Sequence, residues 1–145
     1  MPTINDIKKR FKSLDIKQEA ADSIDRTRDD LIFIQKDQLL HGLNAKGEKI
    51  GKYRNNKYAR VKNQMNPLPG LGNVDAKVKG DFYGGLFVDV RTDTYIVESG
   101  DEKSKDLQKR YGEELIGLND DSKSTYIKFN LRPDFIAGVR KKLKL

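Results

Sequence analysis

Residues 86–99, LFVDVRTDTYIVES, constrain the fold most, because apolar and polar residues alternate on both sides of a short turn sequence. Taking Thr92 and Asp93 as a two-residue loop sets the register of an antiparallel hairpin. The register pairs Val88 with Val97 and Val90 with Tyr95 on one face, and Arg91 with Thr94, Asp89 with Ile96 and Phe87 with Glu98 on the other. One face is apolar and the other is mixed, so the sequence predicts a hairpin that packs one side on a core.

A further strand is predicted ahead of the hairpin. Val74, Ala76 and Val78 alternate with charged residues, which is typical of a strand with one apolar face. Residues 80–85, which follow, predict a tight turn or a single helical turn. We therefore expect an antiparallel sheet of three or more strands. Its apolar face is predicted to contain Val78, Val88, Val90, Tyr95 and Val97.

Helix signals fill the first 42 residues. Thr3 and Asp6 predict a capping box at the start of a short helix, and Asp15 is a second cap. An apolar stripe then runs as far as Leu39, and Gly42 follows as a helix-terminating glycine, which predicts one helix of about 25 residues. The stripe consists of Ala20, Ile24, Leu31, Ile34 and Leu39, and the opposite face offers the ion pairs Asp22 with Arg26 and Asp25 with Arg28.

The C-terminal third is also mostly helical. Residues 105–111 predict a short helix stopped by Gly112, residues 113–118 predict a buried turn, and Asn119 is a cap. A final apolar stripe contains Ile127, Leu131, Phe135, Val139 and Leu143. Pro133 either kinks one helix there or starts a second one after Arg132.

These patterns predict an α+β fold, an antiparallel sheet with a central hairpin packed against long N-terminal and C-terminal helices. A chain of 145 residues is enough for one core. We expect a single domain with an N-terminal helical arm (1–42), a basic loop region (43–73), and the sheet with the C-terminal helices (74–145).

The excess of positive charge is confined to one quarter of the chain. Residues 1–45 hold eight basic and eight acidic side chains, and residues 80–145 hold twelve of each. Residues 46–79 hold nine basic and two acidic side chains, so their balance of +7 equals the net charge of the whole chain. Their basic residues are Lys46, Lys49, Lys52, Arg54, Lys57, Arg60, Lys62, Lys77 and Lys79. A local positive field of this kind attracts phosphate or an acidic protein surface.

Several classes of function are disfavoured. The chain has no cysteine and a single histidine, His41, which is expected at a helix end without the partners of a catalytic triad. The glycines match no phosphate-binding motif, so no cofactor is expected. Five acidic residues near the hairpin offer oxygen ligands for Mg²⁺, but ordinary turn acids explain them better: Asp89, Asp93, Glu98, Asp101 and Glu102. We expect neither an enzyme nor a metal site.

The N-terminus, MPTINDIKKRF, contains no apolar run of signal-peptide length, and no stretch of about 18 apolar residues occurs. The sequence therefore predicts a soluble protein made in a cytoplasm. Within the basic loop region, Tyr53 and Tyr58 alternate with basic side chains, a combination that stacks bases and follows phosphates in nucleic-acid binders. The alternative is a solvated face whose tyrosines belong to the core.

Four segments together resemble a known group of proteins. They are GLNAKGEKIGKY (42–53), VDAKVKGDFYGGLFV (74–88), KDLQKRYGEELIGL (105–118) and YIKFNLRPDFIAGVRKKL (126–143). Their order is similar to that of small tailed-phage and prophage proteins of the tail-completion, or virion-morphogenesis and head–tail joining, group. The chain departs from that group at the turn before the hairpin, where Lys79-Gly80 replaces Thr-Gly.

The resemblance implies a structural virion protein of a bacteriophage or prophage. Such a protein forms a homo-oligomeric ring at the head–tail neck or proximal tail, as a tail terminator or connector through which DNA passes. The resemblance supplies no catalytic residues. The expected partners are other neck or tail proteins, with possible non-specific contact to genomic DNA and none to membranes, and assembly takes place in the bacterial host cytoplasm. A small basic nucleic-acid-binding protein of a mobile element is the alternative. The expected interaction residues, toward DNA or an acidic neighbour, are Lys46, Lys49, Lys52, Arg54, Lys57, Arg60 and Lys62.

Overall fold

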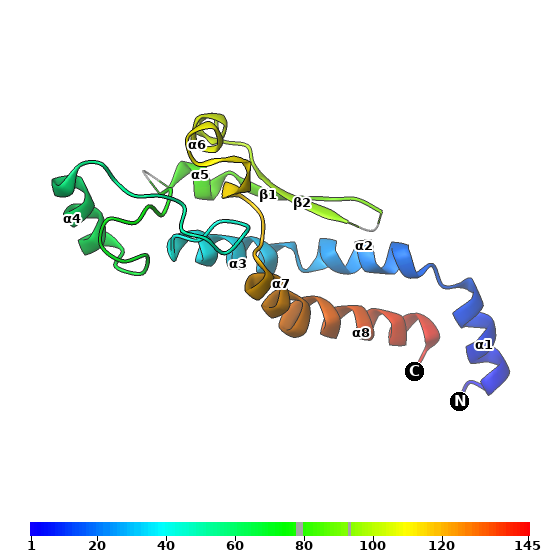
Figure 1. Ribbon diagram of the computed structural model, residues 1–145. Coiled ribbons are helices and arrows are strands. Elements are labelled where there is room, and N and C mark those ends of the chain that lie inside the picture. The colour runs from blue at the N-terminus through cyan, green and yellow to red at the C-terminus, as the bar shows by residue number, and fades with distance from the viewer. Residues whose placement is uncertain (78–79, 93) are drawn as a thin grey trace.

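A computed structural model describes residues 1–77, 80–92 and 94–145 of the chain. The molecule is elongated, and both termini lie at the same end of it (Figure 1). Its helices and strands are, in chain order, α1 (Ile4–Ser13), α2 (Ile16–Arg26), α3 (Arg28–Leu40), α4 (Asn56–Met65), α5 (Asp81–Gly84), β1 (Leu86–Val90), β2 (Tyr95–Ser99), α6 (Lys103–Tyr111), a 3₁₀ turn (Glu113–Leu115), α7 (Asp120–Tyr126), a π-helical segment (Ile127–Leu131) and α8 (Arg132–Leu143).

The hairpin packs against the N-terminal and C-terminal helices, which confirms the predicted fold class. Strand β1 contacts α2 and α3, and the ring of Tyr95 on β2 meets the ring of Tyr126 on α7 edge to face at 6.1 Å. Edge-to-face contacts of this kind favour a fixed mutual orientation of the two rings. The molecule is therefore mainly helical, with one β-hairpin on the helices.

The predicted register of the hairpin is also confirmed. Val88 pairs with Val97 and Val90 with Tyr95, and the remaining strand pairs match as well. Beyond the strands, the N–H of Arg91 donates to the carbonyl of Thr94 (2.8 Å). Asp93, the second residue of the expected turn, lies outside the described residues.

The predicted third strand is wrong over the part that the structure describes. Ala76 has a φ of 59°, which no extended strand contains, and the Asp75 carboxylate accepts the N–H of Lys77 (2.9 Å) in place of a partner strand. Val74 and Ala76 are buried nevertheless. Val78 and Lys79, which complete the expected strand, lie outside the described residues, so the sheet has two strands among those that are described.

The predicted single helix from Ile16 onward is interrupted. Helix α2 ends at Arg26 and α3 begins at Arg28, with Thr27 between them at φ −104° and ψ 16°. The Thr27 hydroxyl donates to the Ser23 carbonyl (2.8 Å) and shares a hydrogen bond with the Tyr126 hydroxyl (2.7 Å). Threonine back-bonding of this kind bends a helix.

The predicted helix ends are confirmed. Thr3 and Asp6 form the capping box of α1, and the Asp15 carboxylate accepts the N–H of Gln18 (3.1 Å) at the start of α2. After α3, the N–H of Gly42 donates to Leu39 and the N–H of Leu43 donates to Gln38, the two bonds of a Schellman motif. Gly42 has a φ of 74°, which explains the glycine.

Pro133 lies at the start of helix α8, as the second of the two alternatives predicted, but no break separates α8 from the helix before it. The chain stays helical from Asp120 to Leu143, and a π-helical segment lies immediately ahead of the proline. A proline ring clashes with the carbonyl four residues before it in a regular α-helix. The wider π turn gives that carbonyl room, and Pro133 then occupies the first turn of α8.

Helices α2 and α8 form an antiparallel arm joined by ion pairs. The Arg26 guanidinium contacts Glu19 (3.2 Å) and Asp134 (2.9 Å), and the Lys142 ammonium contacts Glu19 (2.5 Å). The expected Asp22–Arg26 pair is therefore wrong, because the Arg26 side chain turns toward α8. The expected Asp25–Arg28 pair is present.

The core lies where α3 meets the hairpin and the segment 115–118. Leu31, Leu39, Leu115 and Tyr126 are fully buried there. Two buried glutamines of α3 hold that segment in place by hydrogen bonds. Gln35 Oε1 accepts the N–H of Gly117 (2.9 Å), and Gln38 donates to the Gly117 carbonyl (2.8 Å).

Candidate functional site

The basic loop region is built around helix α4, at the opposite end of the molecule from the termini (Figure 1). Asn55 caps the helix, because its side-chain oxygen accepts the N–H of Tyr58 (3.1 Å). At its base, the N–H of Tyr53 donates to the Gly72 carbonyl (2.8 Å) and the N–H of Val74 to the Gly51 carbonyl (2.9 Å). The region is therefore an ordered lobe rather than an open loop.

A buried carboxylate holds this lobe to the core. The Asp75 side chain is paired with the Lys62 ammonium (2.9 Å) and accepts hydrogen bonds from the Asn66 amide (3.1 Å) and the Lys77 N–H (2.9 Å). Burial by itself raises the pKa of this carboxyl, but the donors from Lys77, Asn66 and Lys62 outweigh it and hold the pKa below its usual value. Asp75 is therefore ionised at neutral pH.

Lys62 consequently belongs to the interior. Only 7% of the residue is exposed, and its ammonium also donates to the Lys77 carbonyl. The expectation that this cation reaches outward to DNA or an acidic neighbour is wrong. The ion pair could not be predicted from the local sequence, because Asp75 lies 13 positions further along the chain.

The other expected interaction residues divide into two sets. Lys46 pairs with Glu114 (3.2 Å), and the Lys49 ammonium donates to the Pro69 carbonyl (3.0 Å), so both have partners within the chain. The second set is exposed and forms no ion pair with any carboxylate that the structure describes; it consists of Lys52, Arg54, Lys57 and Arg60. These four cations are the part of the predicted site that can act on a partner.

Helix α4 also exposes an apolar strip, which we call the α4 strip and which consists of Tyr58, Val61 and Met65. These residues are 42%, 52% and 72% exposed, while Ala59 and Lys62 on the other face are buried. The Tyr58 ring packs edge to face on Tyr53 at 5.0 Å. The strip is exposed because α4 docks on the rest of the lobe through its opposite face.

The charges on α4 are unfavourable for the isolated helix. Its first turn contains no acidic residue, and Lys57 stands there with Arg54 just ahead of it. Cations at the positive end of a helix dipole cost roughly 0.3–1 kcal/mol each when exposed. An external anionic surface would remove this cost.

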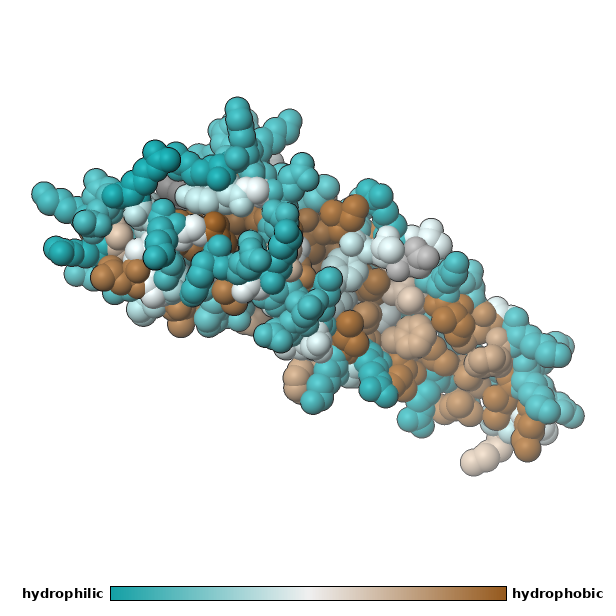
Figure 2. Space-filling model, in the orientation of Figure 1, coloured by the Kyte–Doolittle hydropathy of each residue, from teal (hydrophilic) through white to brown (hydrophobic). Residues whose placement is uncertain are grey.

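A second exposed apolar surface lies on the arm. A hollow of about 270 Å³ is lined by Ala20, Ile127, Leu131, Phe135 and Arg132. Ile4 and Phe11 of α1 are exposed as well. Figure 2 shows hydrophobic side chains gathered over the end of the molecule where α1, α2 and α8 lie. The apolar stripes of these helices are therefore only partly covered by the chain itself.

The residues considered for catalysis or metal binding do not converge. His41 Nδ1 is bonded to the Asp37 carbonyl (2.8 Å) at the end of α3. The Asp89 carboxylate forms an ion pair with the Arg91 guanidinium (3.5 Å). Asp93 lies outside the described residues. Within the part of the chain that the structure describes, no three His, Cys, Asp or Glu side chains are grouped to hold a metal ion.

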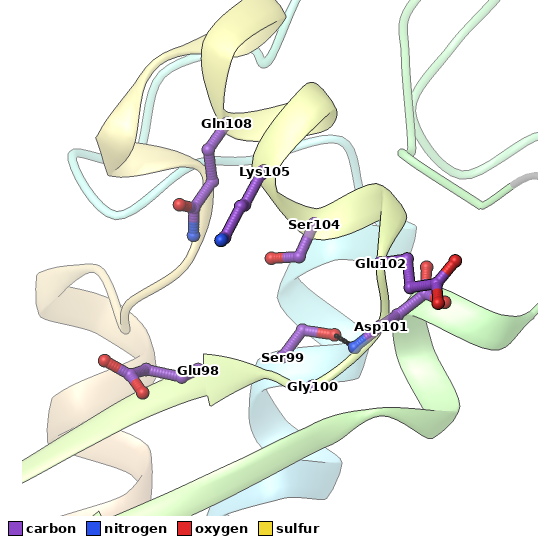
Figure 3. A pocket seen from close by; sticks show the side chains of 8 residues that line it. All are labelled: Glu98, Ser99, Gly100, Asp101, Glu102, Ser104, Lys105 and Gln108. Atoms are coloured by element: carbon purple, nitrogen blue, oxygen red, sulfur yellow. Dashed lines mark hydrogen bonds between the residues drawn. The ribbon is translucent and has the colours of Figure 1, made fainter.

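The remaining acids line a polar hollow of about 500 Å³ between β2 and α6. Figure 3 shows the Glu98 carboxylate at one end of it and the side chains of Asp101 and Glu102 at the other. The Ser99 hydroxyl accepts the N–H of Asp101 (3.3 Å) and donates to the Phe82 carbonyl (3.0 Å), as in an ordinary strand-to-helix turn. Of these three acids, Asp101 has a local role, because its carboxylate accepts the N–H of Lys103 (3.3 Å) at the start of α6.

Across residues 1–77, 80–92 and 94–145, no helix is both long enough and apolar enough to cross a membrane. Comparison of the chain with models of protein families, with curated proteins and with solved structures finds no match.

Proposed function

We propose that this protein is a structural component of a tailed-bacteriophage or prophage virion. It forms a homo-oligomeric ring at the head–tail neck or the proximal tail, as a tail-completion or connector protein, and DNA passes through the ring. Its activity is assembly rather than catalysis. It works with other neck or tail proteins and is assembled in the bacterial host cytoplasm.

One observation carries this proposal: two different apolar surfaces are exposed at opposite ends of an elongated molecule. The α4 strip lies at one end, and the hollow of the arm with Phe11 of α1 lies toward the other. Contiguous exposed apolar surface usually marks a site of association. A head-to-tail ring requires two unlike surfaces on each subunit, because each subunit has a different neighbour on either side.

The order of the four sequence segments that resemble tail-completion and head–tail joining proteins supports the same reading. The four exposed cations Lys52, Arg54, Lys57 and Arg60 add a positive surface that suits either channel DNA or an acidic neighbouring subunit.

Negative-stain electron microscopy and sedimentation velocity of the purified protein test the proposal. We expect a closed, symmetric particle without DNA, formed by the protein alone or with a neck or tail protein of the same phage. A protein that stays monomeric or dimeric at every concentration and with every such partner would overturn the proposal.

A second candidate is a small basic nucleic-acid-binding protein of a mobile element. The observation in its favour is that Tyr58 is exposed on the same helix as Lys57 and Arg60, an arrangement that suits stacking and phosphate contact. A protein of this class would remain monomeric or dimeric and would shift a short DNA duplex in a gel, whereas the ring protein assembles without DNA.

A further inference from the structure

Helix α3 presents an exposed face whose composition complements that of α4. Phe33 is 71% exposed at the middle of this helix. Asp29 stands four residues before it and Asp37 four residues after it, and both are exposed, as is Asp30. Residues four apart lie on one side of a helix, so an aromatic ring is flanked by carboxylates along one line, which we call the α3 strip: Asp29, Asp30, Phe33 and Asp37.

The carboxylates of the α3 strip form almost no ion pairs with the side chains that the structure describes. Asp29 and Asp30 form no ion pair with any cation that the structure describes, and Asp37 has only His41 nearby (3.6 Å). The four cations around α4 likewise have no carboxylate partner there. The α3 strip and the cations around α4 therefore carry opposite charges, almost all without an ion-pair partner among the described residues, and each set lies beside exposed apolar side chains.

We propose that the α4 strip of one copy of this protein packs on the α3 strip of a second copy. Tyr58, Val61 and Met65 cover Phe33, and Lys57 and Arg60 lie opposite the carboxylates of Asp29 and Asp37. This contact joins the α4 strip to the α3 strip rather than to the arm hollow, so it names one subunit interface of the ring and rests in that respect on the proposed function.

The two strips match in length. Asp29 to Asp37 and Lys57 to Met65 each span eight residue steps, which is about 12 Å at the rise of an α-helix. An apolar centre with charged flanks is the usual arrangement of a specific protein interface. The contact also places anions near the first turn of α4, which contains Lys57 and no acidic residue.

Charge repulsion makes the arm hollow a poorer binding site for α4 than the α3 strip. Arg132 lines that hollow, and Lys128 lies beside it on the same helical segment with its ammonium over the Phe129 ring (5.3 Å). A basic helix would be repelled there by like charges. The α3 strip is apolar at its centre as well, but its flanks are acidic.

Duplex DNA fits the α4 surface less well than a second copy does. Val61 and Met65 stand among the cations, and a phosphate backbone offers them no apolar partner. The apolar strip between the charges therefore favours a protein surface.

Charge reversal with rescue tests the proposal. One variant carries Lys57→Glu and Arg60→Glu, a second carries Asp29→Lys and Asp37→Lys, and a third carries all four changes. Each of the first two should lower the fraction of assembled protein in sedimentation by about tenfold or more, and the third should recover most of it, because opposite charges face each other again. Unchanged circular dichroism and thermal midpoints show that the variants are folded.

Cross-linking gives a second readout, because the native chain contains no cysteine. Chains carrying Gln64→Cys on α4 are mixed with chains carrying Asp30→Cys on α3, and a short bis-maleimide is added. We expect a covalent dimer of the two chains. The matched control replaces the second chain with one carrying Ala137→Cys on the arm, which should give little product.

The outcomes separate this contact from the ring itself. Rings that persist in the reversed variants, with no cross-link, overturn the contact and leave the proposed function standing. A cross-linked, charge-sensitive dimer without rings supports the contact and overturns the ring. A monomeric protein that binds a short duplex, and loses that binding when Lys57 and Arg60 are reversed, overturns both.

Discussion

Gly138 stands on α8 at a position where alanine would ordinarily be the better helix former. A Cβ added there would overlap Oε1 of the buried Glu19 and lie 2.8 Å from Nη2 of Arg26. The glycine therefore lets the carboxylate of α2 come close to the backbone of α8, where Arg26 and Lys142 neutralise it. Close helix approach and charge pairing are linked at this residue.

Gly138→Ala should consequently destabilise the protein. Intrinsic helix propensity alone would raise stability by about 1 kcal/mol. Displacing the Glu19 carboxylate from its partners costs roughly 1–3 kcal/mol, so we expect a net loss, measured by urea unfolding. The exposed neighbour provides a control: Ala137→Gly should cost only its helix propensity. A more stable Gly138→Ala variant would mean that Glu19 can move without penalty.

Lys62 and Lys57 stand on the same helix and differ in burial. Lys62→Ala leaves the carboxylate of Asp75 buried without its cation, which costs about 3–5 kcal/mol. Lys57→Ala removes an exposed cation and should change stability by about 0.5 kcal/mol or less. Urea unfolding of the two variants measures this difference, and equal losses would contradict the assignment of Lys62 to the interior.

The ion pair of Asp75 also predicts a dependence on pH. Because the pKa of this carboxyl is lowered in the folded protein, its contribution to the free energy of unfolding is complete above its unfolded pKa of about 3.9. The contribution is lost as the pH falls through the folded pKa. Asp75→Asn should therefore be less stable than the native protein from pH 7 to pH 5, with a difference that narrows below about pH 4. A constant difference down to pH 3 would contradict this.

At the scale of elements, the hairpin illustrates what a local pattern can predict. Each strand alternates in polarity and a short turn sequence joins the strands, so the register followed from residues 86–99 alone. The helix caps at Thr3, Asp15 and Asn119 were predictable for the same reason, since the groups that form them lie within a few residues of each other.

The features that sequence patterns missed depend on distant residues. The bend at Thr27 involves the Tyr126 hydroxyl, which lies 99 positions away along the chain. The left-handed backbone at Ala76 interrupts an alternation that otherwise fits a strand. Among the candidate site residues, the exposure of Lys57 and Arg60 was predicted correctly, but the burial of Lys62 was not, because its partners come from another segment.

The hairpin makes a sharp test of packing because adjacent positions face opposite sides. Val88 is buried and Phe87 is exposed on the same strand. Val88→Asp places an unpaired charge in the core and should unfold the protein, whereas Phe87→Asp should leave it folded. Thermal unfolding followed by circular dichroism distinguishes the two. A folded Val88→Asp protein with an unchanged midpoint would contradict the packing of the hairpin.

At the scale of the whole molecule, the charge excess and the exposed apolar surfaces both favour association. An elongated subunit with apolar faces near both ends leaves part of its hydrophobic surface in water. Association of copies would bury that surface. Uncompensated charge would then direct which surfaces meet, since like charges oppose the wrong pairing and opposite charges favour the right one.

The final prediction concerns four exposed cations of the basic loop region. Replacing Lys52, Arg54, Lys57 and Arg60 with Gln should leave the fold nearly intact, because exposed charges usually contribute within about ±0.5 kcal/mol each. The same variant should reduce the yield of completed, infectious particles.

A matched control removes four exposed cations of α6, with Lys103, Lys105, Lys109 and Arg110 all changed to Gln. It has the same change in net charge but should assemble normally, which separates a local contact from a general loss of charge. If the contact is between subunits, added salt should weaken assembly of the native protein and have less effect on the variant of the basic loop region. Normal particle yield and DNA delivery from that variant would show that its cations are only a solvated surface.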